Sequence, residues 1–313
     1  MRIAEYARAA TMAGIVVGCG GGQAFRDAAE PDVQAEPDAS ATLAPLFRFA
    51  VVGDTRPANV DDVPGYPTAV ITQIWADVEA SAPHPDFALS TGDYVDANPS
   101  THPSTVNAQL DAYLGARAQF HNAVFAAMGN HECTGDVPSN CGSGASDGFT
   151  ANYIEFMRRM VVPHGISTPY YVVHFAASDG SWTTKLVFIA ANAWNATQAA
   201  WLDQALAEPT TYTFVLRHEG AAVIHAPGVP PSEPIIASHP LTLKIVGHDH
   251  TYSHLDGEVT IGNGGAPLSS SVDYGYAIVE RLATGAIQLT AYDYRSGAAI
   301  DQFRVNADGT PAP

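Results

Sequence analysis

The sequence predicts an α/β fold in which layered β-sheets are covered by helices. Short apolar runs alternate with segments of helical spacing from residue 47 onward, and many of the runs end in polar turns. This alternation is typical of largely parallel sheets with helices on both faces. Apolar residues make up 46% and charged residues only 15% of the 313 residues, which indicates a globular chain that can bury a large core.

The first half of the folded region is expected to contain three strands and two helices. Residues 47–54, 85–93 and 123–132 each combine an apolar run with a polar turn, which is the pattern of a buried strand and the loop after it. Residues 68–80 and 105–120 carry apolar side chains three and four positions apart, so each is predicted to be an amphipathic helix.

The second half adds one predicted helix at residues 197–207 and a series of strands. These strands are expected at residues 170–175, 184–192, 211–219, 243–247, 258–262, 276–280 and 287–294. We find no internal repeat, so one α/β domain at residues 46–313 accounts for all of these segments.

The first 18 residues have the features of an export signal. Two arginines precede the apolar stretch at residues 9–17, which is too short to span a membrane but suits the core of a secretory signal. The stretch ends in VVGC, which resembles a bacterial lipobox, so we expect Cys19 to carry a lipid that anchors the protein outside the cytoplasm. A secretory signal with an incidental cysteine is the alternative. Residues 19–45 are rich in Ala, Pro and acids and are expected to form a flexible linker.

The two remaining cysteines, Cys133 and Cys141, lie eight positions apart in a stretch rich in small polar residues. In an exported protein such a pair is expected to form a disulfide, with two free thiols as the alternative.

The charge balance excludes some partners. The chain has 32 Asp and Glu against 14 Lys and Arg, a formal net charge of −18. Such a balance argues against nucleic acid and against electrostatic docking on an anionic membrane, because both need a basic surface. A small phosphate ester remains compatible, because a bound metal reverses the field close to it.

Side chains that can bind metals follow five of the predicted strands. The strand ends read GDTR (53–56), GDYVD (92–96), GNHE (129–132), VLRHE (215–219) and GHDH (247–250). Ligands gather at the carboxyl ends of strands in α/β sheets, so these side chains are expected to meet in one cleft. Four of the ends contain a glycine, which lets the chain turn sharply there. Carboxylates, imidazoles and an amide without thiolate suit Zn, Mn or Fe, and so many ligands are best used by two ions.

These five motifs, in this order over residues 54–250, resemble those of the calcineurin-like metallophosphoesterase superfamily, in particular its purple acid phosphatase-like extracytoplasmic bacterial members. The segments TQAAWLDQAL and TIGNGGAPL add to the likeness. The resemblance implies a layered sandwich of two mixed β-sheets flanked by helices. It also implies a centre of two metal ions whose ligands are Asp93 as the bridge, Asp54 and His250 in the first site, and Asn130, His218 and His248 in the second. His131 would assist the leaving oxygen.

Two positions depart from the common pattern of the family. Arg56 stands where many members have a histidine ligand, and a guanidinium is better suited to binding a phosphate oxygen than a metal. The first site is therefore expected to be the weaker one. Asp96 stands either in the place of a metal-binding tyrosine or in the place of an aspartate that pairs with His131. We favour the pairing, because a general acid needs to be oriented.

The expected activity is hydrolysis of phosphate monoesters by a metal-bound hydroxide. A phosphodiesterase acting on nucleotides or phospholipid headgroups, and a non-catalytic metal-binding lipoprotein, are the alternatives. The loops at 55–67, 94–104, 133–151 and 225–240 are expected to select the substrate. Four further residues are candidates for secondary roles: Glu132 and Glu219 as groups that orient the histidines before them, and His225 and His254 as substrate contacts.

Overall fold

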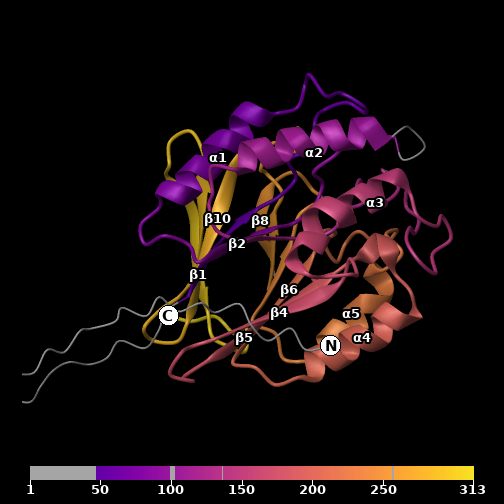
Figure 1. The fold of residues 1–313 in the computed structure, drawn as a ribbon. Helices are drawn as coiled ribbons and strands as arrows, with labels where there is room; N and C mark the ends of the chain where they lie inside the picture. The colour runs from indigo at the N-terminus through magenta and orange to yellow at the C-terminus, as the bar shows by residue number, and fades with distance from the viewer. Residues whose placement is uncertain (1–46, 99–102, 136, 256) are drawn as a thin grey trace, which may run out of the picture. The chain divides into compact units, whose positions relative to one another are not determined.

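Two six-stranded mixed β-sheets, flanked by helices, form the fold (Figure 1). The structure is a computed structural model that describes residues 47–98, 103–135, 137–255 and 257–313. The export signal, the lipidation of Cys19 and the linker all lie outside the described residues. Within the described part, no helix is both long and apolar enough to cross a membrane.

The first sheet has the strand order β12-β11-β10-β1-β2-β3. Three strands run parallel: β1 (Arg48–Val52), β2 (Phe87–Ser90) and β3 (Val124–Ala126). Three antiparallel strands extend the sheet on the other side of β1: β10 (Gly275–Arg281) pairs with β1, β11 (Ile287–Asp293) with β10, and β12 (Ala299–Val305) with β11. The parallel strands are buried along almost their whole length, as their continuous apolar sequences predict.

The second sheet has the order β4-β5-β6-β7-β9-β8. Its parallel strands are β5 (Thr183–Ile189), β6 (Tyr212–Arg217), β7 (Leu243–Val246) and β9 (Glu258–Ile261). Its edges are the antiparallel strands β4 (Tyr171–Ala176) and β8 (Tyr252–Leu255). Both sheets are therefore mixed, as the resemblance implied.

Aromatic side chains fill the space between the two sheets. Phe49 of β1 packs edge-on against Phe214 of β6, with ring centroids 5.4 Å apart. Phe87 of β2 stacks on Phe175 of β4 at 4.4 Å. Aromatic pairs of this geometry bury large apolar areas and lock the two sheets in one relative position.

Helices cover the outer faces of the sandwich (Figure 1). On the first sheet lie α1 (Thr68–Ala80) and α2 (Pro103–Arg117). They are followed by α3 (Ala151–Phe156), its π-helical continuation η1 (Met157–Val161) and the 3-10 turn η2 (Val162–His164). On the second lie α4 (Ala196–Ala207) and α5 (Val229–Ala237), and the 3-10 turn η3 (Ala191–Ala193) precedes α4. The buried residues of α1 are Ile71, Ile74, Trp75 and Val78, which is the spacing that the sequence predicted.

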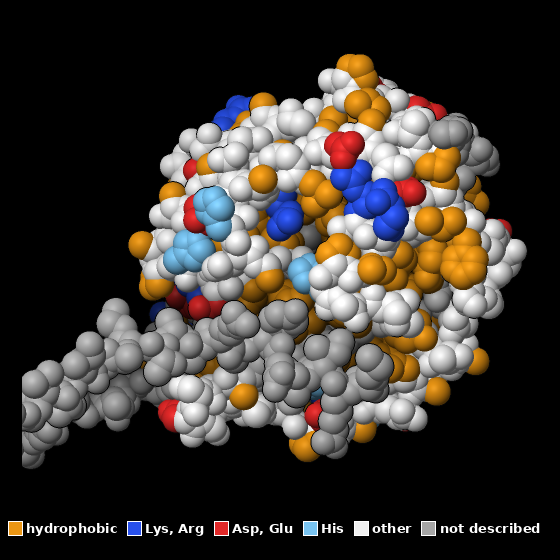
Figure 2. Space-filling view, in the orientation of Figure 1, with side chains coloured by type: hydrophobic (Ala, Val, Ile, Leu, Met, Phe, Trp, Pro, Cys, Tyr) orange, Lys and Arg blue, Asp and Glu red, His pale blue; other side chains and the backbone are white. Residues whose placement is uncertain are grey.

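The π-helical segment η1 is tied to α2 by two arginines. Arg158 donates to the side-chain oxygen of Asn107 at 2.8 Å, and Arg159 donates to the backbone carbonyl of Asn107 at 2.9 Å. Basic side chains gather over α2 and α3 in the space-filling view (Figure 2). Both arginines also pair with acids, namely Glu155 and Asp111, so their charges are balanced locally.

Two α-helices and two strands are present that the sequence did not indicate, α3, α5, β8 and β12, together with the short helical segments η1, η2 and η3. Helix α5 lies inside residues 225–240, which were expected to form a loop, so that prediction was wrong. Its sequence VPPSEPIIA contains three prolines, which usually exclude a helix. Two of them fall in the first turn, where a missing N–H removes no helical hydrogen bond, so the helix still forms.

The predicted disulfide is present between Cys133 and Cys141. It closes a loop that begins directly after the GNHE motif at the end of β3. The backbone N–H of Cys141 donates to the carbonyl of Asn192 at 2.8 Å, which fixes the far end of the loop on the turn that follows β5 of the second sheet.

Candidate metal centre

The five polar strand ends meet at one edge of the sandwich. They follow β1, β2 and β3 of the first sheet and β6 and β7 of the second. Every predicted site residue lies within 4 Å of at least one other. The nine residues are Asp54, Arg56, Asp93, Asp96, Asn130, His131, His218, His248 and His250. The strand order that gathers them is the one expected for ligand sites in α/β sheets.

Four of the ligand candidates have an unusual backbone conformation. The φ angles are 56° at Asp54, 57° at Asp93, 72° at His248 and 47° at His250. Among the described residues, Asp61 alone shares a positive φ without being a glycine. Such conformations persist only where surrounding structure enforces them, and they concentrate at functional sites.

The glycines of the motifs are needed mainly for space. Only Gly92 has the positive φ that a sharp turn requires, at 112°. A side chain at Gly129 would collide with the carboxylate of Asp93, and one at Gly247 would collide with that of Asp54. The expectation that these glycines serve to turn the chain therefore holds at Gly92 alone. Close packing explains the others, against carboxylates at Gly129 and Gly247 and against Thr91 and the carbonyl of Ile261 at Gly53.

Three lone-pair atoms converge at the ends of β3, β6 and β7. His218 Nε2 and His248 Nδ1 each lie 3.1 Å from Asn130 Oδ1 and 3.3 Å from each other. His218 Nδ1 faces the carbonyl of Thr91 at 2.9 Å and donates its proton there, so Nε2 faces the site. The amide nitrogen of Asn130 donates to the carbonyl of Gly135 at 2.7 Å, which turns its oxygen inward.

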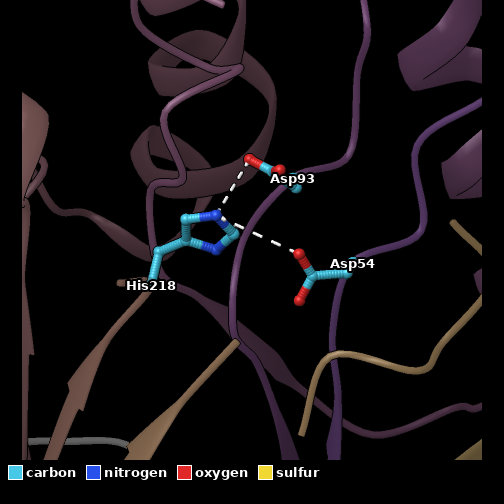
Figure 3. Close-up of side chains that lie close together, drawn as sticks. All are labelled: Asp54, Asp93 and His218. Atoms are coloured by element: carbon cyan, nitrogen blue, oxygen red, sulfur yellow. Dashed lines mark ion pairs between the residues drawn. The ribbon is translucent and has the colours of Figure 1, made fainter. Parts of the chain in front are cut away.

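These atoms fit a transition-metal ion. Ligands about 2.1 Å from a tetrahedral ion lie about 3.4 Å from one another, close to the observed spacing. Asp93 Oδ1 joins them at 3.2 Å from His218 Nε2 (Figure 3). Burial disfavours a charged ring, yet Asp93 and Asp54 raise the pKa of His218 well above its usual value, so a bound cation competes with a proton there.

A second group of ligands surrounds Asp54. Its carboxylate is fully buried, lies 3.6 Å from His250 Nε2 and 4.0 Å from His218 Nε2, and accepts the backbone N–H of His248. His250 Nδ1 donates to the carbonyl of Pro267 at 2.8 Å, so its Nε2 faces the carboxylate. Burial raises the pKa of Asp54 well above its usual value, which a nearby cation would reverse.

Asp96 joins Arg56 to His131. One oxygen lies 2.9 Å from Arg56 Nη1, and the other lies 3.1 Å from His131 Nδ1. The backbone of Asp96 is held by Gln109, which accepts its N–H at 2.8 Å and donates to its carbonyl at 3.1 Å. Although burial acts to lower it, the pKa of His131 is raised by Asp93 and Asp96. Asp96 is thus placed to orient both side chains.

Glu132 binds backbone rather than a histidine. Its carboxylate accepts N–H groups from Asp93 at 2.8 Å, Tyr94 at 2.7 Å, Val95 at 3.2 Å and Gly129 at 2.9 Å. The expectation that it orients the preceding histidine was therefore wrong; it holds the turns after β2 and β3 together. Burial and the charge of Asp93 raise the pKa of Glu132 to about 7.

The other candidate residues separate into two groups. His225 and Glu219 line a small cavity next to Asn130 and His248. His254 instead stacks on Phe303 of β12, with ring centroids 3.6 Å apart, so its contact joins two edge strands. The sequence offered no signal for this difference, because both histidines follow a ligand-bearing segment closely.

Comparison with known proteins places this geometry in context. The profile of the calcineurin-like phosphoesterase family matches residues 47–252. A comparison with curated proteins gives no match. Among solved structures, the fold is similar to GAP50, the anchor in the inner membrane complex of Plasmodium, with a TM-score of 0.55 and 15% identity over 85% of this chain and 90% of that one. It is also similar to the purple acid phosphatase PPD1 from yellow lupin seeds, with a TM-score of 0.56 and 16% identity over 86% of this chain and 57% of that one.

Proposed function

Because the chain belongs to the calcineurin-like phosphoesterase family, we propose that it hydrolyses phosphate monoesters with two metal ions that share Asp93. The first ion would be held by Asp54, Asp93 and His250, and the second by Asp93, Asn130, His218 and His248. When bound, the ions would activate a water as the nucleophile and stabilise the charge of the phosphoryl group. Nitrogen and oxygen donors without thiolate suit Zn, Mn or Fe.

One observation carries the proposal of two ions. The two oxygens of Asp93 face different partners: Oδ1 lies 3.2 Å from His218, whereas Oδ2 lies 3.6 Å from Arg56 and 3.9 Å from His131. A carboxylate whose two oxygens have different partners suits the role of a bridge between neighbouring cations.

Arg56 and His131 would act on the substrate. The guanidinium of Arg56 is fixed by Asp96 and remains protonated, so it can donate hydrogen bonds to phosphoryl oxygens that approach Asp93. His131 is buried and held by the same carboxylate, so its ring has a fixed direction next to the reacting group. We assign to it the stabilisation of the leaving oxygen.

We also propose that the enzyme works outside the cytoplasm, attached to a bacterial membrane by a lipid on Cys19. The disulfide between Cys133 and Cys141 supports this location, because such bonds persist in oxidising compartments. Labelling of cells with a radioactive fatty acid tests the anchor, and a Cys19→Ser protein that still carries label would contradict it.

Metal analysis combined with a nitrophenyl phosphate assay tests the activity. We expect close to two equivalents of transition metal, loss of activity on chelation and recovery when metal is restored. His248→Ala should abolish turnover while the circular dichroism spectrum stays unchanged. Bound metal without hydrolysis of any ester would instead support a binding protein, and faster hydrolysis of bis-nitrophenyl phosphate would support a diesterase.

A further inference from the structure

A small cavity opens beside the metal centre, on the side of Asn130 and His248. Its volume is about 20 Å³, which accommodates one small chemical group because a water needs about 10–15 Å³. The walls come from the disulfide loop, from η3, from the end of β6 and from the loop after it. The residues that line it besides the two ligands are Val137, Pro138, Asn192, Glu219, Val223, His225 and Ala226.

Glu219 is the distinctive residue of this cavity. Its side chain is fully buried, and Oε1 accepts a hydrogen bond from the amide nitrogen of Asn192. The other oxygen, Oε2, is also buried and has no hydrogen-bond partner among the described residues. Buried polar atoms nearly always have a partner, because a carboxylate oxygen without one loses its hydration and gains nothing in return.

The guanidinium of Arg217, two positions earlier in the chain, does not supply that partner. Arg217 is fully buried on β6, but its guanidinium donates to Ser232 at 2.8 Å, to Glu233 at 2.6 Å and to the backbone carbonyl of Glu219 at 2.7 Å. Its donors are therefore directed elsewhere. Glu219 Oε2 is therefore an acceptor without a partner among the described residues, in a side chain that lines the cavity.

We propose that the cavity receives the alcohol part of the phosphate ester, and that Glu219 accepts a hydrogen bond from a hydroxyl or amine on it. This proposal rests on the proposed function, because it assumes that the phosphoryl group binds at the metal ions, which Asn130 and His248 separate from the cavity. The small volume admits only a short chain, and the apolar walls formed by Val137, Pro138, Val223 and Ala226 suit its methylene groups. The substrate class is thus aminoalkyl or hydroxyalkyl phosphates.

Binding of three phosphonates to the metal-loaded protein tests the assignment without turnover. Titration calorimetry would compare 2-aminoethyl, 2-hydroxyethyl and propyl phosphonate, which differ only in the terminal group. A hydrogen bond to a carboxylate is expected to favour a donor-bearing ligand about tenfold to a hundredfold over the propyl compound. The amine and hydroxyl arms show which donor is preferred. Equal affinity for all three in the wild-type protein would overturn the proposal.

Glu219→Gln provides the matched variant. The amide keeps the size of the side chain and can still accept from Asn192, but it presents a donor in place of Oε2, so the preference should fall below about threefold. Glu280→Gln on β10 is the control: Glu280 pairs with Arg48 and Gln288 on the first sheet and should leave the preference unchanged. A preference that survives in Glu219→Gln would overturn the assignment to this residue. Metal content and melting temperature of both variants report whether they are folded.

Hydrolysis of the corresponding phosphates separates this inference from the proposed function. Selective binding of the amine or hydroxyl phosphonates without hydrolysis of any phosphate would support the cavity's role and contradict the proposed activity. Hydrolysis of 2-aminoethyl, 2-hydroxyethyl and propyl phosphate with equal kcat/KM, together with equal phosphonate affinities, would support the activity and refute the role of Glu219.

Discussion

Replacing Glu132 by glutamine should destabilise the protein more than any other isosteric change at the metal centre. The four N–H groups that its carboxylate accepts belong to the turns after β2 and β3. Glutamine has one acceptor oxygen, so in either orientation its amide nitrogen faces two of these N–H groups. Each buried N–H without a partner costs about 1–3 kcal/mol, and two of them cost about 4 kcal/mol in total.

Thermal unfolding in the presence of a chelator measures this loss without a contribution from bound metal. For a domain of this size, about 4 kcal/mol corresponds to a midpoint lowered by about 8–16 °C. Glu219→Gln is a suitable control, because Glu219 is equally buried but accepts a single hydrogen bond from the chain, which glutamine retains. A Glu132→Gln midpoint within about 3 °C of wild type, or an equally large shift in the control, would refute the reasoning.

Three further predictions concern the loop, the acid limit and the first metal site. Replacing Cys133 and Cys141 by serine should lower the free energy of unfolding by about 2–3 kcal/mol in urea, and a shift below 1 kcal/mol would contradict this. Although burial opposes its ionisation, Arg217 and Lys244 lower the pKa of Glu233 from 4.5, so the stability that Glu233 contributes is present above pH 4.5 and lost as the pH falls below it. The free energy of unfolding of Glu233→Gln in urea should therefore depend less on pH in that range. An unchanged pH dependence would count against the ion pairs. Arg56→His restores the common family ligand and should tighten binding of the weaker metal equivalent at least tenfold in a chelator competition, whereas equal affinity would show that position 56 lies outside the site.

The parts of the fold that the sequence predicts are those with strong local patterns. Helix α1 has the bounds expected from its apolar spacing, Thr68–Ala80, and the central parallel strands coincide with continuous apolar runs. The edge strands β8 and β12 lack such a pattern because they are largely exposed. Contacts between distant segments hold them, such as the hydrogen bond from Tyr252 to Asp301 at 2.7 Å, and a single segment carries no sign of its partner.

The site, like the fold, has parts that a local sequence pattern predicts and parts that depend on contacts between distant segments. Each ligand candidate follows an apolar strand directly, so position along the chain alone predicts the metal centre. Besides the two ligand candidates, the side chains that line the cavity come from three separate segments, with Val137, Asn192 and Glu219 as one representative of each. Their meeting depends on how the two sheets pack, which no local pattern encodes. The role of Glu132 was missed for a related reason, since its partners are backbone groups of another strand end.

The left-handed backbone conformation at Asp54, Asp93, His248 and His250 lowers the stability of the fold, while the side chains at these positions serve the proposed activity. Each of these residues is held in a conformation that costs about 1 kcal/mol relative to glycine, which adopts it freely. Substitution by glycine would relax the chain and delete the ligand in one step. A glycine at any of these four positions is therefore expected to raise the stability of the fold and to remove a ligand that the proposed function requires.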